Sequence, residues 1–194
     1  KFTSIPIIGE IVHEKSKSPL VIGEGKRTFV AEQFRKLRTS LPYIGMTGNR
    51  KKLMVTSNAS GDGKSFIVAN LGLSLAMVDK KVVVLEFDLS NPSLSEKLNV
   101  TTINKGLTDY LRGNAEPEEI IRRTDINDNL FVMPAGSLPE NPSELIMSDR
   151  VPELMEFLTP LFDYIIIDTA PVGLLSDAYV LSSYCDATLY VIRH

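Results

Sequence analysis

The most informative stretch of this sequence is Ser57-Asn-Ala-Ser-Gly-Asp-Gly-Lys-Ser65. It follows a short apolar run, residues 53–56, and precedes a segment with helical periodicity, residues 66–78. Gly61 and Gly63 allow successive backbone N–H groups to curl around an anion, and the following helix adds the positive end of its dipole. A glycine-rich loop between a strand and a helix is typical of a phosphate-binding loop, although Asn58 stands where the general pattern has its first glycine.

The end of this loop carries side chains suited to a nucleotide. Lys64 is placed to bridge the β- and γ-phosphates of the ligand. The Ser65 hydroxyl is placed to bind Mg²⁺, which prefers octahedral oxygen ligands and keeps several waters. The sequence therefore predicts a site for a nucleoside triphosphate with its metal ion.

Two acidic strand ends support this interpretation. The runs Val82-Val-Val-Leu-Glu-Phe-Asp88 and Tyr164-Ile-Ile-Ile-Asp168 both finish a buried strand with carboxylates. Ligands of open α/β sheets bind at this carboxyl edge. Asp168 is expected to hold Mg²⁺ through water, and Glu86 and Asp88, two residues apart, point the same way from the neighbouring strand.

The whole chain has the pattern of an α/β domain with a mostly parallel sheet and helices on both faces. None of the apolar runs alternates strictly, so we expect strands that are buried on both faces. The expected strands are residues 53–56, 82–87, 130–134, 164–168 and 188–192, and the expected helices are residues 30–41, 66–78, 118–123 and 153–161. Residues 1–27 are expected to form an extended arm before one phosphate-loop domain, 28–194, whose last strand reads as interrupted, so we expect a fragment truncated at its C-terminus.

Composition excludes several classes of protein. The 194 residues carry a formal charge of −3, from 21 basic and 24 acidic residues, without the basic stripe of a nucleic-acid-binding protein. A single cysteine cannot form an internal disulfide. No apolar run reaches the roughly 18 residues of a spanning helix, so we expect the chain as given to be soluble.

Taken together, the motifs resemble the bacterial tyrosine kinases of the polysaccharide-export type, whose core is shared with the Min and Par partition ATPases. The loop ending at Ser65 is similar to the family's Walker A, and the acidic strand ends are similar to its Walker A′ and Walker B motifs. Further similar segments are Ile5-Pro-Ile-Ile-Gly-Glu-Ile11, Glu32-Gln-Phe-Arg-Lys-Leu-Arg38 and Gly136-Ser-Leu-Pro-Glu-Asn-Pro-Ser-Glu-Leu145.

The resemblance implies an ATP- and Mg²⁺-dependent protein-tyrosine kinase that autophosphorylates in trans and regulates capsular or exopolysaccharide synthesis and export. Its partners would be a tyrosine-rich tail of the neighbouring subunit in a cyclic homo-oligomer, and a membrane co-polymerase segment of the same polypeptide at the cytoplasmic face of the inner membrane. The expected residues are Gly61, Asp62, Gly63, Lys64, Ser65 and Phe66 for the nucleotide, Ser65, Asp88 and Asp168 for the metal, and Lys64, Glu86 and Asp88 for catalysis.

One predicted helix carries the expected oligomer interface. At about 100° per residue, the apolar side chains of residues 30, 34, 37 and 41 form one narrow stripe that packs on the domain. Glu32, Arg35 and Arg38 fall off this stripe, and the resemblance implies that they meet an adjacent subunit near its nucleotide site. The sequence alone favours a solvated face with a weak ion pair between Glu32 and Arg35.

Departures from the family pattern keep two alternatives open. Glu86 replaces the first aspartate of Walker A′, and Ser90 replaces its arginine. A weakly active, nucleotide-gated assembly module therefore remains an alternative to the kinase, in which Glu86 is the candidate base and Asp88 the second choice. A Min- or Par-like ATPase is disfavoured, because its loop would carry a second lysine where this chain has Ala59.

Overall fold

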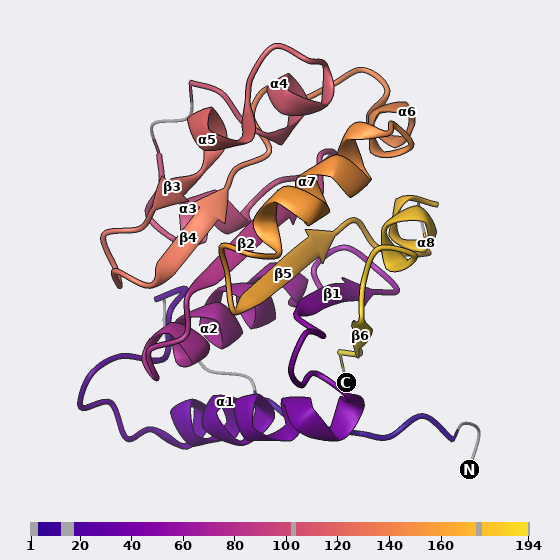
Figure 1. The fold of residues 1–194 in the computed structure, drawn as a ribbon. Coiled ribbons are helices and arrows are strands. Elements are labelled where there is room, and N and C mark those ends of the chain that lie inside the picture. Colours follow the sequence, from indigo (N-terminus) through magenta and orange to yellow (C-terminus); the bar gives the residue numbers. More distant parts are fainter. Residues whose placement is uncertain (1–3, 13–17, 102–103, 174–175, 194) are drawn as a thin grey trace.

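The structure, a computed structural model, describes residues 4–12, 18–101, 104–173 and 176–193. These residues form a six-stranded sheet with the order β3-β4-β2-β5-β1-β6 (Figure 1). All neighbouring strands are parallel except β3 and β4, which are antiparallel. The strands are β1 (Lys52–Ser57), β2 (Val82–Phe87), β3 (Arg122–Arg123), β4 (Leu130–Met133), β5 (Tyr164–Thr169) and β6 (Ala187–Val191).

Helices cover both faces of this sheet. The first three α-helices in the chain cover one face, and the later α-helices cover the other face (Figure 1). The helices are α1 (Phe29–Ser40), the 3₁₀ turn η1 (Leu41–Ile44), α2 (Lys64–Ala76), α3 (Leu94–Lys97), α4 (Leu107–Leu111), α5 (Pro117–Ile120), α6 (Pro142–Ile146), α7 (Arg150–Leu158) and α8 (Asp177–Ser182). Among the described residues, no helix has both the length and the apolar character needed to cross a bilayer.

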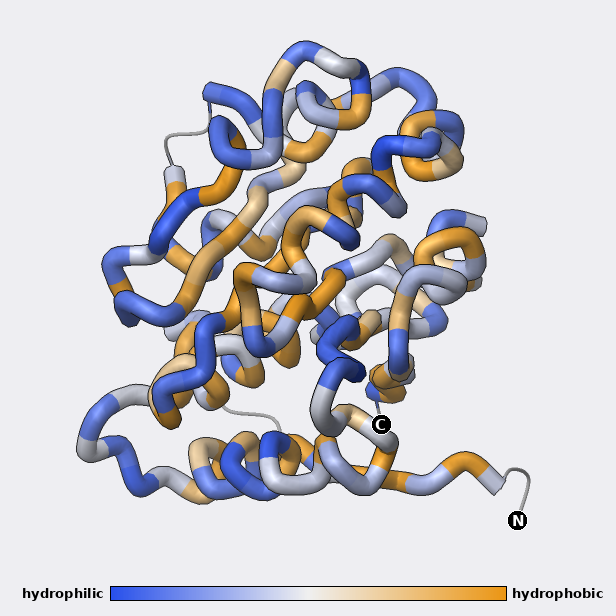
Figure 2. The backbone as a smooth tube through the Cα atoms, viewed as in Figure 1, coloured by the Kyte–Doolittle hydropathy of each residue, from blue (hydrophilic) through white to orange (hydrophobic). Residues whose placement is uncertain are grey.

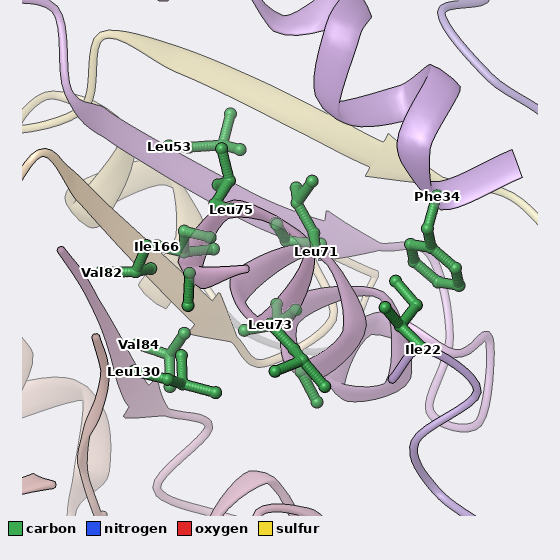
Figure 3. Packing of buried hydrophobic residues seen from close by; sticks show 14 of the residues in the cluster. Ile22, Phe34, Leu53, Leu71, Leu73, Leu75, Val82, Val84, Leu130 and Ile166 are labelled. Atoms are coloured by element: carbon green, nitrogen blue, oxygen red, sulfur yellow. The ribbon is translucent and has the colours of Figure 1, made fainter. Parts of the chain in front are cut away.

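Each central strand divides its side chains between two hydrophobic cores. On β2, Val82 and Val84 pack against α2, whereas Val83 and Leu85 join the core under α7. Figure 3 shows the first core, where Val82, Val84 and Ile166 of the sheet meet leucines of α2. Because successive strand residues alternate faces, a residue at position 86 of β2 lies on the α2 face. Figure 2 shows the resulting concentration of hydrophobic residues along the central strands.

The predicted α/β class and parallel strands are confirmed. Strand β2 has the bounds expected from its continuous apolar run, and β1, β4, β5 and β6 differ from expectation by one residue at one or both ends. The helix predicted over residues 118–123 is wrong in its second half. Ile121 is extended, with ψ 128°, and the next two residues pair with β4 as strand β3.

The N-terminal arm contacts the domain through both of its described parts, and the Val12 N–H donates to Gln33 Oε1 of α1 at 2.9 Å. The described parts of residues 4–27 contain no helix or strand. Val21 and Ile22 are buried in the core with α1 and α2. The fully buried Asn70 of α2 accepts the Val21 N–H at 2.9 Å and donates to the Pro19 carbonyl at 3.0 Å. The arm is thereby fixed to the helix that follows the phosphate loop.

Candidate nucleotide and metal site

The predicted phosphate loop connects the end of β1 to the start of α2. Gly61 and Gly63 have φ values of 86° and 101°, in the left-handed region that only glycine enters without strain. Gly63 caps α2, and its carbonyl accepts the Ile67 N–H at 2.9 Å. The two glycines therefore turn the chain so that helix α2 begins at Lys64.

Contacts within the chain give the loop its shape. The Asp62 carboxylate accepts the Ala59 N–H at 2.8 Å, so this side chain supports the loop from within. A Cβ atom on Gly173 would lie 2.5 Å from the carbonyl oxygen of Asn58, so only glycine fits where the segment after β5 crosses the loop. Phe66 meets Phe34 of α1 edge to face, with 5.7 Å between ring centroids.

Asp168 is a buried acid whose carboxylate oxygens have no hydrogen-bond partner among the described residues. Asp168 is the second-last residue of β5, and its side chain is fully buried. Burial raises the pKa of Asp168 to about 7, against the opposing effects of the Ser65 hydroxyl and the Lys64 ammonium. Even so, neither carboxylate oxygen receives a hydrogen bond of normal geometry from the residues that the structure describes. An unpaired buried carboxylate is costly, which suits a residue whose partner is a metal ion with its waters.

Lys64 and Asp88 complete the polar cluster. The Lys64 side chain is only 5% exposed, and its charge lowers the pKa of both Asp88 and Asp168. Asp88 follows β2 directly, is largely buried, and accepts the Asn91 N–H at 3.1 Å. Burial is the largest effect on Asp88 and raises the pKa of its carboxyl group. The cluster thus holds one ammonium group and two carboxylates whose protons are more strongly held than usual.

Glu86 differs from these acids because the chain satisfies its carboxylate completely. Oε1 accepts the backbone N–H groups of Leu94 at 2.6 Å and Ser95 at 3.1 Å. Oε2 accepts the Ser95 hydroxyl at 2.6 Å and the Ala135 N–H at 3.0 Å. A carboxylate offers about four acceptor positions, so none remains for a substrate proton or a metal. These contacts argue against the expectation that Glu86 is the catalytic base that accepts the tyrosine proton.

The residues present fit Mg²⁺ better than a metal held by protein ligands alone. No group of three or more His, Cys, Asp or Glu side chains in the described parts of the chain is arranged as a metal cage. Magnesium is usually bound by one or two carboxylates together with phosphate oxygens and waters. Asp88 and Asp168, which both keep acceptor positions unused by the described residues, and the Ser65 hydroxyl match that pattern.

The predicted interface residues have different environments. Glu32 and Arg35 form an ion pair on the exposed side of α1, and Arg35 also donates to the Lys26 carbonyl at 2.8 Å. Arg38 donates to the carbonyl oxygen of Ser74 at 2.7 Å, near the end of α2. The expectation that all three are free to meet another subunit is therefore wrong for Arg38, whose guanidinium attaches α1 to α2.

Three residues near the site were not found from the sequence. Ser95 and Ala135 supply donors to Glu86, and Asn70 fixes the arm to α2. For Asn70 the sequence did carry a signal, namely a polar residue within an otherwise apolar helix. Ser95 and Ala135 had no comparable signal, because their role depends on where the chain returns to the end of β2.

A strand, a glycine-rich loop and a helix with two strand-end carboxylates facing it define a P-loop nucleotide-binding domain. Residues 50–189 match the AAA domain family. MinD of Pyrococcus horikoshii, solved with Mg-ADP, has the same fold, with a TM-score of 0.62 and 29% identity over 73% of this chain and 57% of MinD.

Two further comparisons define the family more narrowly. Tyrosine-protein kinase CpsD of Streptococcus agalactiae is 38% identical over 162 residues, which are 84% of this chain and 69% of CpsD. The kinase domain of Escherichia coli tyrosine kinase ETK has a TM-score of 0.83 at 30% identity, covering 93% of this chain and 70% of that one. The chain belongs to the bacterial tyrosine-protein kinases.

Proposed function

We propose that this domain transfers the γ-phosphoryl group of Mg·ATP to tyrosine hydroxyl groups, acting in trans on the tyrosine-rich tail of a neighbouring subunit. The observation that carries the proposal is the buried Asp168 carboxylate beside the phosphate loop, which accepts no hydrogen bond from the part of the chain that the structure describes. Kinship with CpsD, named a tyrosine-protein kinase, supports tyrosine as the acceptor. The regulated process would be the synthesis and export of a capsular or exported polysaccharide.

The chain's own groups would position the triphosphate. Backbone N–H groups of residues 61–66 would bind phosphate oxygens at the start of α2. Lys64 would neutralise charge on the β- and γ-phosphates, and Asp168, Asp88 and Ser65 would hold Mg²⁺. When bound, Mg²⁺ neutralises charge that develops on the phosphate oxygens. Phosphoryl transfer depends mainly on such positioning and charge stabilisation.

Asp88 would accept the proton of the attacking tyrosine. A phenol has a pKa of about 10, so a nearby carboxylate helps to remove the proton as the new bond forms. Of the two acids on this strand end, Asp88 retains unused acceptor positions, whereas the Glu86 carboxylate is fully occupied. Burial raises the pKa of Asp88, which makes its ionised form a stronger base.

Mass spectrometry of the whole protein incubated with Mg·ATP tests this function. We expect phosphate on tyrosine side chains, and we expect labelling of an inactive Lys64→Met subunit when it is mixed with wild type. Release of free phosphate without phosphotyrosine would instead favour a Min-like ATPase. Nucleotide-dependent assembly with neither product would favour the assembly module.

A cyclic homo-oligomer at the cytoplasmic face of the membrane would bring the tail to the neighbouring site. The exposed side of α1 supports such a contact, because Glu32 and Arg35 line a surface groove of about 870 Å³ together with the arm. Ile7 and Phe29, also at this groove, are apolar and largely exposed. A head-to-tail contact of this kind must close by rotation, since otherwise it grows into a filament.

Substitutions in α1 separate assembly from folding. We expect Glu32→Ala with Arg35→Ala to reduce oligomer mass and trans-phosphorylation while ATP binding is unchanged. Arg38→Ala should instead lower the free energy of unfolding by about 1–3 kcal/mol, because it removes a charged hydrogen bond to the Ser74 carbonyl. Analytical ultracentrifugation and urea unfolding measure the two effects. Identical mass distributions for wild type and the double variant would exclude this side of α1 from the interface.

A further inference from the structure

We propose that Glu86 is a positioning residue: its carboxylate fixes helix α3 and the segment after β4 against the end of β2, and so sets the place of Asp88. This inference rests on the proposed role of Asp88 in phosphoryl transfer. Glu86 stands where the family pattern has the first aspartate of Walker A′. The proposal gives Glu86 a role in positioning and not in proton transfer.

The contrast between two adjacent acids supports this assignment. Glu86 and Asp168 are register partners on the neighbouring parallel strands β2 and β5, and both are fully buried. The chain directs four donors to Glu86 and leaves Asp168 without a hydrogen bond from the described residues. A buried carboxylate with four donors is stabilised in place, whereas an unpartnered one remains available to a ligand.

The donors come from the segments that enclose Asp88. Residues 88–93 connect β2 to α3, and Glu86 holds both ends of this connection, since it precedes Asp88 by two residues and binds Leu94 and Ser95. Asp88 itself accepts the Asn91 N–H within that loop. A loop attached at both ends gives its side chains fewer conformations, which preserves the geometry that phosphoryl transfer requires.

The third attachment joins Glu86 to the segment that follows the neighbouring strand β4. Ala135 donates its N–H to Glu86, and its carbonyl accepts the Thr108 N–H at 2.9 Å. The next residue, Gly136, approaches Gly106 so closely that a Cβ atom on Gly106 would lie 2.3 Å from the Gly136 nitrogen. The Glu86 carboxylate thus connects the end of β2 with a segment already tightly held by the start of α4.

The length of the side chain matters for this role. An aspartate at position 86 keeps the charge, but its carboxylate is withdrawn by one methylene group from donors that now lie at 2.6–3.1 Å. A glutamine keeps the length. Its oxygen can accept from Leu94 and Ser95, and its NH₂ group can donate to the Ser95 hydroxyl, so that only the Ala135 N–H loses its acceptor.

The order of activity of two variants therefore distinguishes positioning from proton transfer. If Glu86 positions Asp88, Glu86→Gln retains more activity than Glu86→Asp. We expect kcat to fall by less than about tenfold in Glu86→Gln and by about 10–100-fold in Glu86→Asp. The KM for ATP should stay nearly unchanged in both variants. The pH profile of kcat keeps its acidic limb in Glu86→Gln. The reverse order, with the acidic limb lost in Glu86→Gln, overturns the proposal.

Hydrogen exchange tests the same proposal without kinase activity. Ser95→Ala removes one donor and leaves the Glu86 carboxylate in place, so it is a milder variant that should fold. We expect faster exchange of the Leu94, Ser95 and Ala135 amides in Glu86→Asp, by about tenfold for each lost bond. In Ser95→Ala the backbone N–H groups of residues 94 and 95 keep Oε1 as acceptor, so we expect a smaller increase in the exchange of these two amides. Unchanged protection in both variants overturns the positioning role. If the variants lose protection but the wild-type protein makes no phosphotyrosine, the proposed function is refuted and the positioning role of Glu86 is retained.

Discussion

Lys64→Met is expected to lower the rate of phosphoryl transfer by about three orders of magnitude while the domain folds normally. Among the described residues Lys64 is the one lysine or arginine that is buried, and its ammonium group lowers the pKa of both strand-end carboxylates. Its loss removes charge stabilisation of the transferring phosphoryl group, whereas methionine fills similar space without burying a charge. The free energy of unfolding should therefore stay the same or rise.

Lys80→Met is the matched control for this prediction. Lys80 lies beyond the opposite end of α2 and is exposed, so its replacement removes the same charge from the chain without affecting the loop. Steady-state kinetics and urea unfolding of both variants give the comparison. Wild-type kinetics in a well-folded Lys64→Met protein would show that the phosphate loop is not the site of transfer.

Asp168→Asn is expected to abolish Mg²⁺-dependent transfer and to stabilise the metal-free protein at neutral pH. The pKa of Asp168 is raised to about 7, mainly by burial, from an ordinary value of 3.8. Between these two values the folded chain retains a proton that the unfolded chain has released, so wild-type stability falls as pH rises from about 4 to about 7. Asparagine has no carboxyl group to ionise, so the variant does not lose this part of its stability as the pH rises.

Urea unfolding without metal at several pH values measures this difference. The wild type should lose up to several kcal/mol relative to Asp168→Asn across that interval, on the order of 1.4 kcal/mol for each unit of pKa difference. Asp88, whose pKa is also raised, should leave a smaller slope of the same sign in the variant. Added Mg·ATP should reverse the order at pH 8 by stabilising only the wild type. Parallel pH dependence of the two proteins would contradict an unpartnered Asp168.

The sequence predicted those parts of the molecule that depend on local pattern. Strand β2 is a continuous apolar run, and its bounds agree with the prediction. Strand β3 was missed because its two arginines pair with β4 through the backbone alone, which leaves no apolar signal. The four- to six-residue helices α3, α4, α6 and α8 are too short to show a helical period.

The candidate site was predicted to a similar extent. Parallel strands bring their carboxyl ends to one edge of a sheet, so Asp88 and Asp168 could be placed near the phosphate loop from sequence alone. The environment of Glu86 could not, because its most distant donor, Ala135, lies 49 residues away along the chain. Likewise, the helical periodicity of α1 predicts that Arg38 lies off the apolar stripe, but it does not predict that the Ser74 carbonyl of α2 lies within hydrogen-bond distance of Arg38.

The attachment of the arm to Asn70 determines how a mechanical force would enter this domain. Tension on the chain before Val12 would first load the hydrogen bond from Val12 to Gln33 of α1. Tension that reaches Pro19 would then load the hydrogen bonds of Asn70 with Pro19 and Val21, and through them the axis of α2. Asn70 lies six residues beyond Lys64, roughly 9 Å along the helix. A pull from the N-terminal side would therefore reach the helix that carries the phosphate loop before it strained any strand of the sheet.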